Sequence, residues 1–356
     1  MDVIPVLKGA VEQAASDIFL IPGLPLSYKV NGRIVQQDEK PVPLAEISGM
    51  IGQIYQLANQ REIEKVADDG DDDFSFSVPG VSRFRVSSFK QRGSLAAVIR
   101  VVHFELPNYQ EIHIPQSVID VAGKTKGLVL VTGPAGSGKS TTLACIIDQI
   151  NRTKSSHIIT LEDPIEYLHR HNKSIVTQRE IGSDSESYIT GLRAALRQAP
   201  DVILLGEMRD YETIKTAITA AETGHLVIST LHTIGASNTI DRIIDAFSPE
   251  QQQQIRIQLS MILVAIFSQQ LVPAVGDTEV PAFETVYLND AMRNMVREAK
   301  THQIDALIHS STDAGMVSMD DSLLALFREG TITRETLLAY CESADQMSRR
   351  ISRDSR

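Results

Sequence analysis

Residues 133–140 combine glycines, a lysine and a hydroxyl group in a spacing suited to binding phosphate. They follow the apolar run 128–132 and precede a helical stretch, so the context is strand, loop and helix. Glycines let consecutive backbone N–H groups turn toward phosphate oxygens, and the helix adds the positive end of its dipole. A glycine-rich turn without function is the alternative, which the complete eight-residue match disfavours.

This loop predicts an ATP site with Mg²⁺. We expect Lys139 to reach the β- and γ-phosphates and Ser140 to hold the metal ion. The other predicted nucleotide contacts are Gly133, Pro134, Ala135, Gly136, Ser137, Gly138, Thr141 and Thr142.

Two further apolar runs end in carboxylates that could orient the water attacking a γ-phosphate. Residues 158–161 lead into Glu162 and Asp163, and residues 202–205 lead through Gly206 to Glu207. Either glutamate is a competent general base, so both are predicted catalytic residues, and Glu207 is also a predicted Mg²⁺ ligand. Helix capping, the alternative role for such acids, suits Asp163 better.

One histidine stands at each end of the apolar run 226–230. His225 and His232 lie at opposite ends of this predicted strand and therefore cannot share a metal ion. His232 follows the strand, where ligand crevices form in α/β sheets, and we expect it to sense the γ-phosphate. His225 is a second predicted nucleotide contact, although a lone histidine at a strand end is usually an ordinary polar residue.

Elements that would position these groups follow from the apolar patterns. Strands at about 128–132, 158–161, 202–205 and 226–230 alternate with helical stretches, which predicts a mostly parallel sheet covered on both faces. After about residue 236 the pattern predicts helices to the end, including 255–270, 291–297 and 320–327.

Residues 1–100 have the pattern of a small α+β domain. Apolar residues from Ile47 to Ala58 recur at helical spacing, and residues 74–78 and 84–86 alternate as strands do. The acidic cluster 68–73 is interpreted as a solvated turn, because Gly70 is misplaced for a calcium-binding loop. Residues 101–115, with Pro107 and Pro115, are predicted to be a linker, and 116–356 a second domain.

Composition limits the class of protein. The chain has 356 residues, 42% of them hydrophobic and 22% charged, which is typical of a soluble globular protein. A net charge of −11 argues against a surface that binds nucleic acid throughout. Cys145 and Cys341 provide neither a paired zinc site nor a disulfide framework. The apolar run 261–267 falls short of the ~20 residues that span a bilayer, and the N-terminus lacks a secretory signal. Membrane association is therefore expected through partners.

The four motifs, in this order and spacing, resemble the Walker A motif, Asp box, Walker B motif and His box of the secretion ATPase superfamily. That superfamily powers type II secretion and type IV pili. Within it, the stretch Ala291-Met292-Arg293-Asn294-Met295-Val296-Arg297-Glu298 is similar to the C-terminal signature of the pilus retraction ATPases of the PilT type. Assembly-type relatives normally carry a four-cysteine zinc site, and its absence favours retraction over extension.

The resemblance implies an α/β fold with a PAS-like α+β N-terminal domain, then a RecA-like P-loop ATPase domain with a helical C-terminal extension. It also implies a homohexameric ring that binds ATP between subunits. Such a ring would lie in the cytoplasm at the inner face of the cytoplasmic membrane, on an inner-membrane pilus platform protein, without direct contact with nucleic acid.

An arginine-rich segment completes the resemblance. Arg85 and Arg100 are the predicted catalytic arginines, and Arg92 is a predicted nucleotide contact, supplied to a neighbouring subunit's site. The implied function is an ATP-hydrolysing motor for pilus retraction and twitching motility. The alternatives are a pilus extension or type II secretion ATPase, an accessory retraction paralogue, a nucleic-acid translocase and a scaffold that does not hydrolyse ATP.

Overall fold

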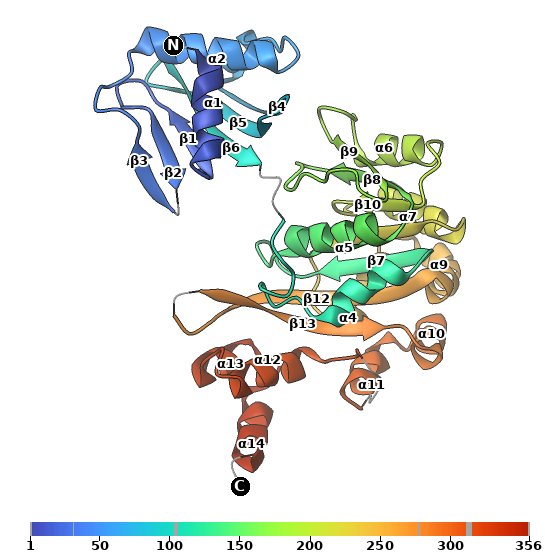
Figure 1. The fold of residues 1–356 in the computed structure, drawn as a ribbon. Coiled ribbons are helices and arrows are strands. Elements are labelled where there is room, and N and C mark those ends of the chain that lie inside the picture. The colour runs from blue at the N-terminus through green and yellow to red at the C-terminus, as the bar shows by residue number, and fades with distance from the viewer. Residues whose placement is uncertain (1, 31, 103–105, 277, 311–314, 355–356) are drawn as a thin grey trace. The chain divides into compact units, whose positions relative to one another are not determined.

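The computed structural model describes residues 2–30, 32–102, 106–276, 278–310 and 315–354 (Figure 1). The chain divides into two compact units. One comprises Met1–Glu105 together with Pro164–Leu168, and the other comprises Leu106–Asp163 and His169–Arg356. Each unit has a hydrophobic core of its own. In the described part of the chain, no helix has the length and apolar character needed to cross a membrane.

The first unit is a six-stranded sheet in the order β3-β2-β1-β6-β5-β4, and each described pairing is antiparallel. Its strands are β1 (Asp17–Leu20), β2 (Ser27–Val30), β3 (Arg33–Gln36), β4 (Asp71–Val78), β5 (Ser82–Gln91) and β6 (Ser94–Val102). Its helices are α1 (Val3–Glu12), α2 (Leu44–Leu57) and α3 (Glu64–Asp69). The predicted helical stripe is the buried face of α2, through Ile47, Met50, Ile51 and Ile54.

The prediction of a solvated acidic turn is wrong for Asp72, which lies in β4 with its side chain 1% exposed. Arg61 Nε and Nη2 each donate to this carboxylate over 2.7 Å, and Lys65 Nζ lies 3.2 Å away. Burial alone would raise the pKa of Asp72, but hydrogen bonds from Arg61 and Lys65 outweigh it and hold the pKa below its usual value. The local acidic pattern does not reveal the basic partners, which precede it in the chain.

The second unit contains a seven-stranded sheet in the order β13-β12-β7-β11-β10-β8-β9. The pairings are parallel, except that β12 and β13 are antiparallel, so the predicted mostly parallel sheet is confirmed. The strands are β7 (Gly127–Thr132), β8 (His157–Glu162), β9 (Ile175–Glu180), β10 (Val202–Leu205), β11 (Leu226–Leu231), β12 (Leu263–Pro273) and β13 (Glu279–Tyr287).

Helices cover both faces of this sheet (Figure 1). Leu128 and Leu130 of β7 belong to the core with α6 (Tyr188–Ala195), α7 (Tyr211–Glu222), α8 (Ala236–Ile244), α9 (Pro249–Ile262), α10 (Asp290–Arg297) and α11 (Ile304–Ser310). Val129 and Val131 belong to the core with α4 (Gln116–Ile119) and α5 (Lys139–Thr153). The last helices are α12 (Met319–Arg328), α13 (Arg334–Tyr340) and α14 (Ala344–Asp354).

The helix predicted over residues 255–270 is wrong in its second half. The α9 helix ends at Ile262, and Leu263, with ψ 119°, begins the extended strand β12. Residues 263 and 265–269 of β12 are buried, because the strand lies inside the sheet with neighbours on both sides. A strand buried on both faces has a continuous apolar sequence that a buried helix can also have.

The segment predicted as a linker has a different start. β6 continues through Val102, which pairs with Arg83, and residues 103–105 lie outside the described residues. The described residues 106–115 contain no helix or strand. Ile114 is buried in the core of the second unit, and Tyr109 and Ile112 pack against it. This segment is therefore held by apolar contacts.

Candidate nucleotide site

Four sequence motifs follow four adjacent parallel strands. The phosphate-binding loop follows β7, His232 follows β11, Glu207 lies beyond β10 and Glu162 ends β8, and these strands are neighbours in the order β7-β11-β10-β8. The carboxyl ends coincide in register, since Leu231 pairs with Thr132 and Leu205 pairs with both Ser229 and Leu161. The sheet therefore brings the four motifs to one edge, where α/β proteins bind ligands.

The loop backbone requires glycine. Gly133, Gly136 and Gly138 have φ values of 142°, 77° and 85°. A Cβ atom on Gly133 would lie 2.1 Å from the carbonyl oxygen of Gln269, so a larger residue has no room there. Gly138 immediately precedes α5 and has no side chain with which to cap it. The first N–H groups of α5 are therefore oriented for an anion.

Polar groups inside the loop fit a polyphosphate. Lys139 is 9% exposed, and its Nζ donates to the carbonyl oxygens of Gly133 (2.9 Å) and Pro134 (2.7 Å). Ser137 Oγ is buried and has no hydrogen-bond partner among the described residues. A buried cation beside an unsatisfied hydroxyl group matches the needs of phosphate oxygens. Ser140 and Thr141 are half-buried at the start of α5, while Pro134, Ala135 and Gly136 are exposed.

Thr142 does not fit the predicted nucleotide contact. Its side chain is fully buried, and Oγ1 donates to Gln269 Oε1 over 2.7 Å, so the hydroxyl group is engaged with β12. Gln269 is itself 2% exposed, and its Nε2 lies 2.8 Å from the position of a Cβ atom on Gly138. This glutamine supports the loop, and the sequence does not reveal it, because the apolar pattern predicts a helix over residues 255–270. Two adjacent glutamines inside an apolar run were the available signal.

Glu207 lies between two basic side chains. Its Oε2 is 2.6 Å from Arg209 Nε and 3.5 Å from His232 Nε2. The glutamate side chain is 12% exposed, whereas those of His232 and Arg209 are 53% and 75% exposed. A nearly buried carboxylate next to an accessible imidazole can take a proton and orient a water molecule.

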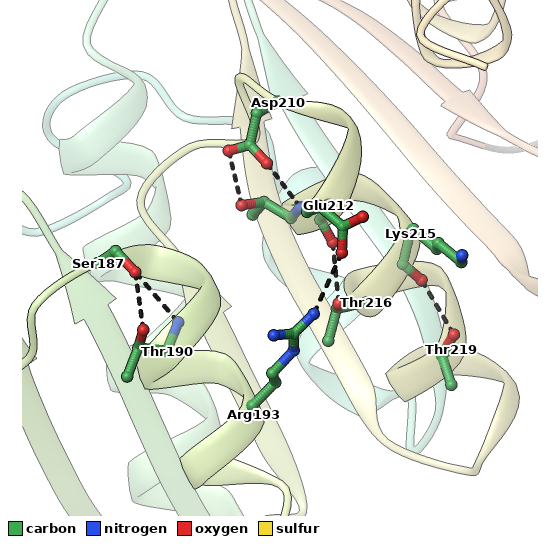
Figure 2. Close-up of polar contacts among 9 residues, drawn as sticks. Ser187, Thr190, Arg193, Asp210, Glu212, Lys215, Thr216 and Thr219 are labelled. Carbon is green, nitrogen blue, oxygen red and sulfur yellow. Dashed lines mark hydrogen bonds and ion pairs between the residues drawn. The ribbon is translucent and has the colours of Figure 1, made fainter. Parts of the chain in front are cut away.

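A capped helix, α7, follows this glutamate directly in the chain. Asp210 caps α7 by accepting from the backbone N–H (2.9 Å) and Oγ1 (2.8 Å) of Thr213. Figure 2 shows this cap, the Ser187 cap of α6, and the 3.1 Å ion pair between Arg193 and Glu212 that joins the two helices. Residues 206–209 thus run between a buried strand and a capped helix, which restricts their path.

Glu162 has a different environment. Its Oε1 accepts from Thr160 Oγ1 (2.5 Å) and from Gln178 Nε2 (3.2 Å) of β9, the strand on the far side of β8 from β10. Strands are about 4.8 Å apart, so β8 lies roughly 14 Å from β7 and β10 roughly 10 Å. Residues 163–174, all described, form no helix, so Asp163 does not cap one.

Tyr188 at the start of α6 is a second residue that the sequence reasoning missed. Its pKa is raised mainly by burial and further by the charges of Glu207, Asp163 and Glu162. The tyrosine therefore carries a neutral hydroxyl group into the region between the two candidate bases. Tyr188 belongs to none of the sequence motifs, so the sequence did not indicate this location.

The two histidines lie at opposite ends of the same strand, β11. His232 contacts Glu207, as described above. His225 precedes β11, and its Nδ1 lies 2.9 Å from the carbonyl oxygen of Ala220 and 3.2 Å from Thr223 Oγ1 at the end of α7. Within this chain His225 thus contacts the C-terminal end of α7, and its role as a nucleotide contact stays a prediction.

The predicted arginines lie in the first unit. Arg85 of β5 and Arg100 of β6 are directly opposite each other, and both are exposed. Arg100 Nε is 3.1 Å from Asp17 Oδ1, and the arginine pair lines a shallow pocket with that aspartate. Arg92 is exposed in the β5–β6 turn with φ 50°. The structure thus brings Arg85 and Arg100 together and separates Arg92 from them.

Comparison with known proteins identifies relatives of this chain. The sequence model of the family described as "Type II/IV secretion system protein" matches residues 2–319. The chain is 42% identical over 335 residues to "Type IV pilus retractation ATPase PilT" of Pseudomonas aeruginosa, covering 94% of this chain and 96% of the relative. It is 38% identical to "Type IV pilus ATPase PilU" of the same organism, covering 96% and 89%.

A solved structure also matches along nearly the whole length. "Crystal Structure of the Pilus Retraction Motor PilT and Bound ADP" has a TM-score of 0.87 and 44% sequence identity, covering 98% of this chain and 99% of that one. The predicted α/β fold class is confirmed by this match. The chain belongs to the type II/IV secretion system protein family.

Proposed function

We propose that this chain is an ATP-hydrolysing motor that powers type IV pilus retraction and twitching motility. The observation that carries the proposal is the meeting of the phosphate-binding loop, His232 and Glu207 at one edge of the parallel sheet. The relatives named as a pilus retraction ATPase and as a retraction motor with bound ADP support the same function.

ATP binding is assigned to the loop. Lys139, Ser137 and the N–H groups that begin α5 hold the β- and γ-phosphates. Ser140 holds Mg²⁺, which neutralises phosphate charge when bound. No group of three or more His, Cys, Asp or Glu side chains in the described ranges could hold a metal ion. The remaining proposed ligands are Glu207, the phosphates and water.

Glu207 is the proposed general base. It is one strand nearer the loop than Glu162, and it contacts His232. The glutamate accepts a proton from water while the water oxygen forms a bond to the γ-phosphorus and the bond to the bridging oxygen of ADP breaks. Glu207 is also a proposed Mg²⁺ ligand, because Mg²⁺ prefers oxygen ligands such as carboxylates.

The remaining parts form a ring motor in this proposal. The first unit through the end of β6 is the PAS-like domain, the described residues 106–115 are the linker and residues 116–356 are the RecA-like domain. In a homohexamer, Arg85 and Arg100 supply positive charge to a neighbouring subunit's nucleotide, with Arg92 as a further contact. The ring acts on a pilus platform protein at the cytoplasmic face of the inner membrane and does not contact nucleic acid directly.

ATP hydrolysis by the purified chain on a sizing column is the first test. Hydrolysis should follow a hexamer-sized peak, and Lys139→Ala should abolish it while Glu329→Gln, an exposed control on another surface, leaves it intact. Hydrolysis by a monomer, or only with added nucleic acid, would contradict the ring motor.

Retraction itself needs a cellular measurement. In a piliated host that lacks its own retraction ATPases, the wild-type chain should restore shortening of labelled pili and Lys139→Ala should not. Restoration of pilus growth instead would indicate an extension motor. Shortening only when a second retraction ATPase is present would indicate an accessory retraction paralogue.

A further inference from the structure

Two side chains on neighbouring strands bind successive N–H groups of the polypeptide that follows His232. Gly235 N–H donates to Ser268 Oγ over 3.0 Å, and Ala236 N–H donates to Glu284 Oε1 over 2.8 Å. Ser268 of β12 and Glu284 of β13 are directly opposite in register. Their exposed fractions are 0% and 6%, so both acceptor side chains are buried.

The same strand also supports the phosphate-binding loop. Ser268 pairs with Thr132, the residue before the loop, and its neighbour Gln269 contacts the loop and Thr142. Successive residues in a strand point to opposite faces. β12 therefore contacts the phosphate-binding loop through one residue and the segment after His232 through the next.

The segment between His232 and α8 is short and internally bonded. Thr233 Oγ1 lies 2.7 Å from Thr239 Oγ1, and Asn238 Nδ2 donates to the carbonyl oxygen of Ile234 over 3.0 Å. Gly235 has φ 85°. These bonds restrict the path of the polypeptide between His232 and Ala236.

The C-terminal helices also contact the start of α8. Ser237 Oγ donates to Asp305 Oδ2 of α11 over 2.8 Å. A pocket beside Glu284 is lined by the segment after His232, by β12 and β13, and by Asp305, Tyr340 and Glu342. Glu342 Oε2 is in turn 3.7 Å from His309 Nε2. Titratable groups of α11 and of the segment after α13 thus surround the carboxylate.

These neighbours affect the protonation of Glu284. Burial raises its pKa to about 7, the Ala236 N–H group opposes the rise, Asp305 and Glu342 add to it, and His309 opposes it. The charged and neutral forms of Glu284 therefore exchange near neutral pH. A charged carboxylate is the stronger acceptor at the start of a helix.

We propose that Glu284 is a positioning residue for ATP hydrolysis: its carboxylate holds the start of α8 and thereby sets His232 against Glu207. This inference rests on the proposed ATPase function.

The test compares Glu284→Gln and Glu284→Ala with the wild type by kcat, KM for ATP and binding of a fluorescent ADP between pH 6 and 9. Glu284→Ala should lower kcat about tenfold or more, with KM and ADP affinity within about twofold. Glu284→Gln keeps an acceptor oxygen without charge. The wild-type kcat should rise as pH increases through 7. The kcat of Glu284→Gln should lack this rise, and at pH 8 it should be as low as the wild-type kcat at pH 6. Glu342→Gln, in the same pocket without a bond to Ala236, should keep the wild-type kcat at pH 8, where Glu284 is charged in both proteins.

Several results would overturn the inference. One is an unchanged kcat in both Glu284 variants; another is a Glu284→Gln profile that retains the rise. Equal losses of kcat and nucleotide affinity would show a structural role only. Should Glu284→Ala not fold, Ser268→Ala removes the neighbouring bond and should lower kcat with unchanged KM, and an unchanged kcat there would count against the inference. Absence of hydrolysis by the wild type would instead refute the ATPase function.

Discussion

The hydroxyl oxygen of Tyr188 lies 2.7 Å from the position that a Cβ atom would take on Gly206. The carbonyl oxygen of Leu161 lies 3.3 Å from the same position, and Glu162 Cα lies 3.5 Å from it. Many P-loop enzymes carry an aspartate in place of this glycine. Here the tyrosine and the end of β8 occupy the space that a side chain would need, so the glycine before Glu207 has a packing reason.

Gly206→Ala should therefore destabilise the chain, and Tyr188→Phe should relieve part of the cost. Overpacking costs about 1–3 kcal/mol, and here the nearest atom is a hydroxyl oxygen that the phenylalanine lacks. Urea unfolding of the two single variants and the double variant measures the coupling. An equal cost of Gly206→Ala in both backgrounds would show that the tyrosine is not the obstacle.

Glu207→Gln should abolish most hydrolysis while ATP still binds. Loss of a general base lowers kcat by about 10²–10⁴-fold, and the phosphate-binding loop is unchanged. Glu162→Gln is the matched comparison and should have a smaller effect, because Thr160 and Gln178 already bind the Glu162 carboxylate. Steady-state hydrolysis and binding of a fluorescent nucleotide distinguish the two. A larger loss in Glu162→Gln would move the general base to that residue.

Gln269→Ala should weaken both folding and nucleotide binding. It leaves the buried Thr142 hydroxyl group without its acceptor, which costs about 1–3 kcal/mol, and it removes support from Gly138. In a cycle with Thr142→Val, the double variant should lose less than the sum of the single variants, by about 0.5–3 kcal/mol. Strict additivity in urea unfolding would show that this hydrogen bond is not what couples the two residues.

The phosphate-binding loop and its flanking strand were predictable because the motif ties residue types to backbone geometry at short range. The glycines adopt positive φ values, and the preceding apolar run is β7. The central strands β8, β10 and β11 were also predictable, since each is a short apolar run beside a helical stretch.

Long-range pairings were not predictable from local patterns. β12 has the same continuous apolar sequence as a buried helix, so its pairing with β7 and the support that Gln269 gives the loop were missed. The local sequence pattern predicts a solvated acidic run that includes Asp72, whereas the structure buries Asp72 in ion pairs with Arg61 and Lys65. The Ser268–Glu284 pair depends on strand register, which a single sequence does not reveal.

Glu284 should make the folded state less stable as pH rises. The ordinary pKa of the group is 4.5, and its folded pKa is about 7. Between these values the folded chain holds a proton that the unfolded chain has released, so the free energy of unfolding falls with rising pH. The full difference corresponds to about 3 kcal/mol. Below pH 4.5 both states are protonated, and this cost is absent.

Urea unfolding at pH 5, 6, 7 and 8 measures this effect as the difference between Glu284→Gln and the wild type. The difference is needed because His169, whose pKa burial lowers to about 4, acts in the opposite direction: its neutral folded form loses stability as pH falls from 6.5. Both proteins keep His169, so its contribution cancels. The glutamine variant should gain stability relative to the wild type as pH rises. Parallel curves would mean that Glu284 is charged throughout this range, and Glu329→Gln should give parallel curves as the exposed control.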